Sequence, residues 1–262
     1  MPAVRWLKSW TTEAWLELLR EHPPDPQPPT RAVWEVLGLY LVAGIVLALN
    51  YYAAGKVYIW LPDDWVRDGQ PGARRICWAV SVAVFYTVPT VLYVKLVLRR
   101  SMRDLGFTLR GARRHLPIYG LMAAVVFPLV FLVSGTPHFL ATYPMAREAA
   151  NHDIQLALWL AVYALQFVAL EFFFRGFLVL GPQRVLGAWT IPIMVVSYMT
   201  LHFQKPYLET TAAVFAGVAL GMVAMKTRSI FAGIVLHITV AWTMEIMALY
   251  HTGRLPRFLG GD

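Results

Sequence analysis

Ionisable side chains lie inside three stretches of sequence that are otherwise apolar enough for a membrane interior. Glu171 and Arg175 occur in residues 153–181, DIQLALWLAVYALQFVALEFFFRGFLVLG, and two histidines, His202 and His237, occur in later apolar stretches. A charged group at membrane depth is costly unless it is paired or faces water, so such residues are candidates for function. One carboxylate and two imidazoles can together hold and deprotonate a water molecule, or they can ligate a divalent metal.

The spacing of Glu171 and Arg175 places both side chains on one face of a regular helix, about 6 Å apart. The carboxylate is then expected to stay ionised beside the guanidinium. For this pair alone, the alternative to a functional role is a buried ion pair that fixes how the helix packs against its neighbours. For each histidine alone, the alternative is a polar group that bridges two helices.

Three of these groups are expected at similar depths in the membrane. Counted at about 1.5 Å per residue from the cytoplasmic end of each helix, Glu171 lies roughly 15 to 18 Å deep, His202 about 20 Å and His237 about 13 Å. Unrelated polar residues have no reason to share a layer, whereas one polar cavity between helices would produce this pattern. Glu245 lies on the same face of its helix as His237 and is expected to reach the same cavity. Hydrolysis by an activated water is the reaction class that such a cavity supports.

The composition is that of a membrane protein. The 262 residues are 58% hydrophobic and 15% charged, with a mean hydropathy of +0.54, which is too apolar for an ordinary soluble domain. The net charge of +8 comes from basic residues in the loops between apolar runs, a pattern typical of membrane topology and contact with anionic lipid rather than of nucleic-acid binding. Cys77 is the single cysteine, which excludes an intrachain disulfide and a zinc-thiolate site.

The apolar runs predict an all-α, polytopic transmembrane helical bundle of about seven to eight helices, with an additional N-terminal interfacial helix. Gly181 and Pro182 are typical of a helix stop, and Gly217 and Gly221 have the spacing of closely packed helices. The spans are expected at residues 33–55, 77–98, 117–135, 153–181, 188–203, 209–225 and 229–250.

Three regions are predicted along the chain. Residues 1–32 contain an amphipathic helix over 3–21 and the proline-rich spacer HPPDPQPP, residues 33–252 form the membrane core, and residues 253–262 form a short tail. The loop RRSMRDLGFTLRGARRH, residues 99–115, is the most basic of the chain. The positive-inside rule places this loop, and with it the N-terminus, in the cytoplasm.

A set of motifs in the second half of the chain resembles the CPBP intramembrane proteases. The motifs are EFFFRG at residues 171–176, Tyr198 four residues before His202, and a last helix that carries His237. This family includes the type II CAAX prenyl endopeptidases and proteins grouped with bacteriocin self-immunity, and the resemblance covers about residues 100–250. It implies an all-helical core and a glutamic-type peptidase, in which a glutamate and a histidine hold the attacking water and a second histidine is an oxyanion partner.

The resemblance implies a role for each matching residue. Glu171 is expected to be the base or water-holder, His202 the second water ligand and His237 the oxyanion donor. The matching supporting groups are Arg175, as charge partner of the glutamate, and Tyr198. Glu245 is expected to be a third supporting group because it shares a helix face with His237.

Two positions depart from the family pattern. The usual Glu-Glu-x-x-x-Arg motif has Leu170 at its first glutamate, and Ala241 occupies a position that is usually Asn or Asp. Successive helix residues point about 100° apart, so Glu171 does not directly replace a side chain at position 170. Two interpretations follow: Glu171, helped by Glu245, acts as the base of an intramembrane endopeptidase, or the chain is a catalytically inactive scaffold or self-immunity protein that binds a peptide or lipid.

The expected partners are membrane lipid and a peptide or protein substrate with a membrane-associated segment, without nucleic acid. The expected location is the bacterial inner membrane. No cofactor is expected, although two histidines and a carboxylate equally suit a divalent metal such as zinc. A transporter would require inverted repeats or interrupted helices in paired halves, which the sequence does not show.

Overall fold

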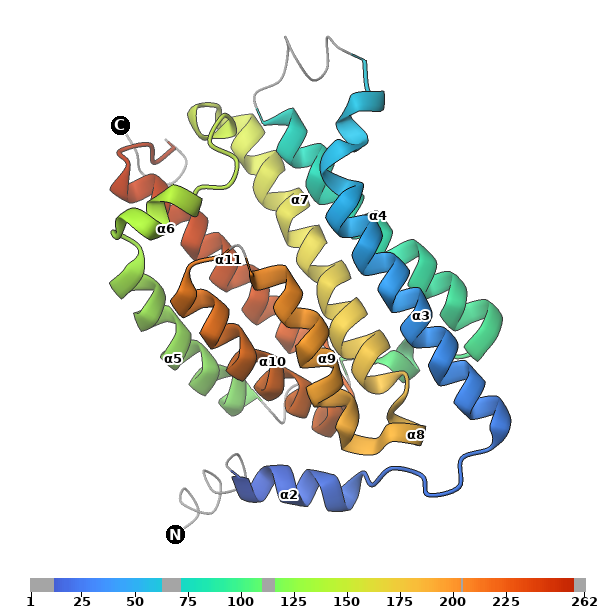
Figure 1. Cartoon of the computed structure of the whole chain (residues 1–262). Helices are drawn as coiled ribbons and strands as arrows, with labels where there is room; N and C mark the ends of the chain where they lie inside the picture. The colour runs from blue at the N-terminus through green and yellow to red at the C-terminus, as the bar shows by residue number, and fades with distance from the viewer. Residues whose placement is uncertain (1–11, 63–71, 110–115, 204, 257–262) are drawn as a thin grey trace. The chain divides into compact units, whose positions relative to one another are not determined.

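The computed structural model describes residues 12–62, 72–109, 116–203 and 205–256. Within these residues every regular element is a helix and no strand occurs, which confirms the predicted all-α class (Figure 1). Seven of the described helical segments are long and apolar enough to cross a membrane, so the protein is of the multi-pass membrane class. They are Thr30–Tyr52, Ala73–Leu98, Leu116–Val133, Asp153–Leu180, Gln183–His202, Tyr207–Thr227 and Phe231–His251.

Four of these spans are single α-helices, and three are composite. The single helices are α3 (Thr30–Tyr52), α5 (Leu116–Val133), α10 (Tyr207–Thr227) and α11 (Phe231–His251). The second span joins α4 (Ala73–Tyr93) to the π-helix η3 (Val94–Leu98), and the fourth joins α7 (Asp153–Glu171) to the π-helix η7 (Phe172–Leu180). The fifth span has four parts in chain order: α8 (Gln183–Leu186), η8 (Gly187–Trp189), α9 (Thr190–Met199) and η9 (Thr200–His202). Shorter elements are α2 (Thr12–Glu21), η1 (Ala54–Trp60), η4 (Met102–Leu105), α6 (Pro137–Thr142) and η6 (Ala149–Asn151).

The predicted spans are confirmed, with shifted ends. The fourth ends at Leu180, as the Gly181-Pro182 pair predicted. The fifth begins at Gln183 rather than at residue 188, because the same proline that cannot continue one helix has a fixed φ that suits the start of the next.

The chain divides into two compact units, which are interleaved in sequence. The first unit comprises Met1–Ala43, Thr90–Arg113 and Phe172–Phe231, and the second comprises Gly44–Pro89, Arg114–Glu171 and Ala232–Asp262, each with the gaps given above. Both units contain parts of the predicted membrane core, residues 33–252. The division of the chain at residues 32 and 252 stays a prediction.

In the first unit, glycines allow helices to pack closely. A Cβ atom added to Gly217 would lie 3.1 Å from the side chain of Val195, and one added to Gly221 would lie 3.0 Å from that of Ile191. These contacts confirm that the two glycines of α10 form a close interface, here with α9. A Cβ on Gly176 of η7 would lie 2.8 Å from the carbonyl oxygen of Leu105, so a larger residue would push η7 away from η4.

The helix α2 also belongs to the first unit. Its Ala14 and Leu18 are wholly buried, which shows that the apolar face of this amphipathic helix packs against the protein. The helix predicted over residues 3–21 is thus present from Thr12 onwards, and residues 3–11 lie outside the described part of the chain. The expected position of α2 in the membrane interface stays a prediction.

In the second unit, α7 and α11 run antiparallel to one another (Figure 1). The indole N–H of Trp242 on α11 donates a hydrogen bond to the carbonyl oxygen of Leu160 on α7, with an N to O distance of 3.0 Å. Asp153 stands in the first turn of α7, where a carboxylate stabilises the positive end of the helix dipole. This helix pair carries Glu171, His237 and Glu245 of the candidate site.

Candidate active site

One face of α7 carries four large side chains at intervals of four residues: Trp159, Tyr163, Phe167 and Glu171. The rings of Trp159 and Tyr163 stack with centroids 4.7 Å apart, and those of Tyr163 and Phe167 meet edge to face at 4.8 Å. Residues four apart are neighbours on a helix surface, so the three rings form a continuous column. Glu171 is placed at the end of this aromatic column.

The Glu171 carboxylate is in direct contact with the imidazole of His237. The distance from Oε1 of Glu171 to Nδ1 of His237 is 2.8 Å, and the glutamate side chain is wholly buried while that of the histidine is 18% exposed. The Phe167 ring stacks on the imidazole with centroids 4.7 Å apart. The structure therefore brings two of the three predicted catalytic residues together, and it fixes the orientation of the imidazole from two sides.

This contact decides which imidazole nitrogen can act on water. A carboxylate oxygen only accepts hydrogen bonds, so Nδ1 of His237 carries the proton in the contact and the lone pair of the neutral ring lies on Nε2. A carboxylate that accepts from Nδ1 fixes the tautomer and the orientation of the ring. The pair can therefore accept a proton from a water molecule at Nε2.

Arg175 and Tyr198, both in the first unit, form a second buried contact. The guanidinium carbon of Arg175 lies 4.6 Å from the centroid of the Tyr198 ring, and the Phe174 ring meets the same tyrosine at 5.2 Å. The arginine is 1% exposed, so the aromatic face supplies a cation-π contact in a site removed from water.

The regular spacing assumed for Glu171 and Arg175 does not continue past the glutamate. Residues Phe172–Leu180 form a π-helix, in which the hydrogen bonds run from i to i+5 and the turn is wider. The α-helical geometry behind the expectation that Glu171 and Arg175 share one face therefore does not extend to Arg175. The ion pair between Glu171 and Arg175 stays a prediction.

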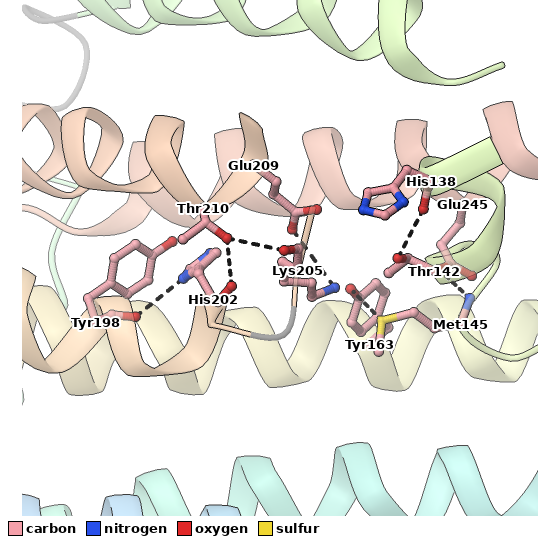
Figure 2. Close-up of polar contacts among 10 residues, drawn as sticks. All are labelled: His138, Thr142, Met145, Tyr163, Tyr198, His202, Lys205, Glu209, Thr210 and Glu245. Atoms are coloured by element: carbon pink, nitrogen blue, oxygen red, sulfur yellow. Dashed lines mark hydrogen bonds and ion pairs between the residues drawn. The ribbon is translucent and has the colours of Figure 1, made fainter. Parts of the chain in front are cut away.

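His202 lies where α9 and η9 end and the chain turns towards α10, also in the first unit. Its Nδ1 lies 3.3 Å from the carbonyl oxygen of Tyr198, and the two rings lie 4.7 Å apart. The carbonyl oxygen of His202 accepts hydrogen bonds from the Thr210 hydroxyl at 2.7 Å and from the Lys205 N–H at 2.9 Å. Figure 2 shows the contacts that hold this histidine through its ring and through its backbone. Its role as second water ligand stays a prediction.

Glu245 is held by two N–H donors. Its Oε1 accepts from the backbone N–H of Met145 at 2.9 Å, and its Oε2 accepts from the indole N–H of Trp159 at 3.0 Å. The Tyr163 hydroxyl donates in turn to the sulfur of Met145 at 3.3 Å (Figure 2). These bonds fasten α7 and the loop after α6 to α11, eight residues along that helix from His237. The expected support of the water chemistry by Glu245 stays a prediction.

The two positions that depart from the family pattern are filled by packed apolar side chains. Leu170 is 6% exposed and Ala241 is 5% exposed. Both therefore contribute to the packing of their helices, and neither carries a polar atom on its side chain that could replace the usual one.

A zinc site requires three protein ligands and an open position, or four protein ligands. Among the described residues, no three side chains of His, Cys, Asp or Glu lie close enough to hold a metal ion together. The contact between Glu171 and His237 supplies two ligand atoms, which do not make a zinc site by themselves. The expectation that no cofactor is used stays a prediction.

The structure thus defines a polytopic helical membrane protein with a buried carboxylate-imidazole pair. Residues 152–243 match the family model of the Rce1-like proteins, described as type II CAAX prenyl endopeptidases. The matched segment contains Glu171, His202 and His237, and it ends before Glu245. This match supports the membership of the CPBP family that the motifs indicated. Searches of curated proteins and of solved structures found no significant match.

Sequence reasoning missed two parts of this arrangement. The Met145 and Trp159 partners of Glu245 were not expected, although Trp159 belongs to the series of side chains four residues apart that ends at Glu171. The direct pairing of Glu171 with His237 was also not expected, because the sequence assigned the glutamate to Arg175. The sequence signal for Glu171, His237 and Glu245 was that they are ionisable residues in apolar stretches. This signal does not specify which side chain each of them contacts.

Proposed function

We propose that this protein is an intramembrane endopeptidase of the CAAX-protease type, which hydrolyses a peptide bond in a membrane-associated substrate. The observation that carries the proposal is the 2.8 Å contact between Glu171 and His237. Both residues lie within the segment that matches the type II CAAX prenyl endopeptidases. A buried carboxylate that holds an imidazole is the arrangement that prepares a histidine for proton transfer.

In the proposed reaction, Nε2 of His237 takes a proton from a water molecule as the water oxygen attacks the substrate carbonyl carbon. Glu171 holds the ring through Nδ1 and balances the positive charge that the imidazole gains. When the carbon-nitrogen bond breaks, the same proton passes to the leaving amine, so the products are a carboxylic acid and an amine. The motif implies that Glu171 is the general base. In the proposed reaction, His237 takes this role instead.

Three further residues enter the proposal from their motifs. His202 is proposed as the second water ligand, and Tyr198 and Arg175 as supporting groups. The proposed partners are membrane lipid and a substrate with a membrane-associated segment. The proposed location is a bacterial inner membrane, with the N-terminus in the cytoplasm as the basic loop at residues 99–115 predicts.

The proposal is tested with the full chain in proteoliposomes, supplied with membrane-anchored peptides that carry a prenylated C-terminus or the same sequence on another lipid anchor. Mass spectrometry identifies the cleaved bond, and reaction in ¹⁸O-labelled water places one labelled oxygen in the new carboxyl group. Glu171→Gln and His237→Gln are each expected to lower kcat by about 10²- to 10⁴-fold. Thr239→Ala, on the exposed part of α11, is the matched control and should leave the rate unchanged.

Full cleavage by both the Glu171 and the His237 variants would contradict the proposal. Absence of cleavage by a folded wild-type chain across the anchored peptides would instead favour the catalytically inactive scaffold. In that case, the same two variants should still bind the peptides that the wild type binds.

A further inference from the structure

The first unit contains a pocket of about 290 Å³ whose wall is formed by segments distant in the sequence. Three arginines line it: Arg100 after the second span, Arg184 at the start of the fifth and Arg228 after the sixth. Two carboxylates, those of Glu21 and Asp104, also line the pocket. Three guanidinium groups gathered around one hollow repel each other, and such a group of charges favours an anion between them.

Neutral acceptors hold two of these arginines in place. Nη1 of Arg100 donates a hydrogen bond to the carbonyl oxygen of Gly181 at 2.6 Å. Nη2 of Arg228 donates to the carbonyl oxygen of Asp104 at 3.2 Å, and its Nη1 donates to the side-chain oxygen of Gln183. Because these acceptors carry no net charge, they fix the guanidinium groups without neutralising them.

The Asp104 carboxylate is engaged by a helix cap. Its Oδ2 accepts hydrogen bonds from the Ser101 backbone N–H at 3.0 Å and from the Ser101 hydroxyl at 2.9 Å, and these bonds lower the pKa of Asp104. Burial, with the nearby Arg184 charge, lowers the pKa values of Arg100 and Arg228. The arginines are therefore crowded and partly removed from water, whereas this carboxylate already has donors of its own.

The three arginines also share a level in the predicted topology. Arg100 lies two residues after the second span ends at Leu98, Arg228 directly follows Thr227, and Arg184 is the second residue of the fifth span. Alternation of the spans puts all three at the cytoplasmic ends of their helices. This is the level of the phosphate groups of the inner leaflet, where anionic headgroups attract basic side chains.

We propose that this pocket, between Arg100, Arg184 and Arg228, binds a phosphate group, carried either by an anionic lipid headgroup or by a soluble phosphate. The planar guanidinium fork matches the oxygens of a phosphate in two-point contacts. The pocket is built from residues of the first unit alone, and the inference does not depend on the proposed peptidase activity.

The lipid source is tested by native mass spectrometry of the full chain released from nanodiscs of phosphatidylglycerol and phosphatidylcholine in equal amounts. The wild type is expected to retain phosphatidylglycerol in preference to phosphatidylcholine. Arg184→Gln, at an exposed position, should weaken this retention about tenfold through the loss of one charge-assisted contact. Arg103→Gln is the matched control, because this arginine is exposed in the basic loop that carries Arg100 but does not line the pocket.

A variant that should bind more tightly separates a local effect from misfolding. Glu21→Gln removes a negative charge from the pocket wall and should strengthen retention of phosphatidylglycerol by a few-fold. A damaged fold would not produce this gain. The thermal unfolding of every variant is measured in the same detergent, so that only folded samples are compared.

The soluble source is tested by titrating inorganic phosphate into the delipidated protein and following its thermal stability. Stabilisation of the wild type by phosphate that is lost in Arg184→Gln, without selective lipid retention, supports the pocket with a soluble ligand. Selective lipid retention that phosphate does not displace supports the headgroup. Binding of neither probe, or equal losses in Arg184→Gln and Arg103→Gln, would overturn the inference.

Discussion

Two wholly buried carboxylates lie on the same helix pair of the second unit, and their partners differ. Glu171, at the end of α7, contacts the imidazole of His237 at 2.8 Å. Glu245, on α11, accepts from the Met145 amide and the Trp159 indole at 2.9 Å and 3.0 Å. Both glutamates have 0% of their surface exposed. Burial is therefore the same for the two glutamates, and their partners differ.

The difference between the partners is whether they can exchange a proton. Amide and indole N–H groups act only as hydrogen-bond donors, so both partners of Glu245 remain donors to its carboxylate. An imidazole has a second ring nitrogen that can accept a proton, so the partner of Glu171 differs in kind from those of Glu245. The segment that matches the family model ends at residue 243. It includes both Glu171 and His237, and it leaves out Glu245.

The largest expected effect comes from Glu171→Gln, which should separate activity from stability. A neutral amide still hydrogen-bonds the imidazole but does not stabilise the imidazolium, so kcat should fall by about 10²- to 10⁴-fold. This fall in kcat corresponds to a reaction barrier that is higher by about 3 to 5 kcal/mol. The free energy of unfolding should change by much less than that. The checks are peptide cleavage and thermal unfolding on the same sample. If the variant unfolds much more easily but each folded molecule still cleaves the peptide at the wild-type rate, then Glu171 has a structural role.

Glu245→Gln should show the opposite pattern. The glutamine has one acceptor oxygen where the carboxylate has two, so either the Met145 or the Trp159 donor would be left buried without its acceptor. The expected cost is about 1 to 3 kcal/mol of unfolding free energy, measured by denaturant or thermal unfolding in detergent. Glu13→Gln, at an exposed position of α2, is the control. Loss of cleavage by a fully stable Glu245→Gln protein would place this residue in the active site.

Trp159→Phe sharpens the account of Glu245 with a smaller change. The phenylalanine keeps a ring against Tyr163 but removes the donor to Oε2 of Glu245, so about 1 kcal/mol of stability should be lost. Because the two residues share one hydrogen bond, the cost of the double variant with Glu245→Gln should be less than the sum of the single costs. Additive costs would show that the bond contributes little.

The smallest effect concerns a histidine without a carboxylate partner. Nδ1 of His22 lies 3.1 Å from the amide nitrogen of Gln183, and burial lowers the pKa of His22 from its usual 6.5, with Arg228 and Lys226 acting in the same direction and Glu21 against it. The unfolded chain then binds more protons than the folded chain, so the stability that the neutral ring contributes is present above about pH 6.5 and is lost as the pH falls towards the lowered value.

This pH effect is measured as the unfolding midpoint in detergent between about pH 7.5 and pH 5, for the wild type and for His22→Gln. The midpoint of the wild type should fall slightly more than that of the variant, which lacks the titrating ring. Parallel curves would mean that His22 contributes nothing to the pH dependence.

The sequence predicted the spans because membrane helices are defined by local length and apolar composition. It also selected Glu171 and His237, because ionisable residues are rare in such stretches. It could not predict the π-helix from Phe172 onwards, which accompanies the close approach of Gly176 to Leu105. The contact of Met145 with Glu245 joins residues 100 positions apart, and no local pattern specifies such a pairing. The arginine pocket was missed for the same reason.

The column of rings on α7 has an electrical consequence for the two glutamates. Trp159, which donates to Glu245, and Glu171 are twelve residues apart in sequence, about 18 Å along the helix axis. At an effective dielectric constant of about 20, two unit charges at that separation interact by roughly 1 kcal/mol. A change of charge at the Glu171 end, as the proposed reaction requires, would therefore shift the energy of Glu245 by no more than about this amount.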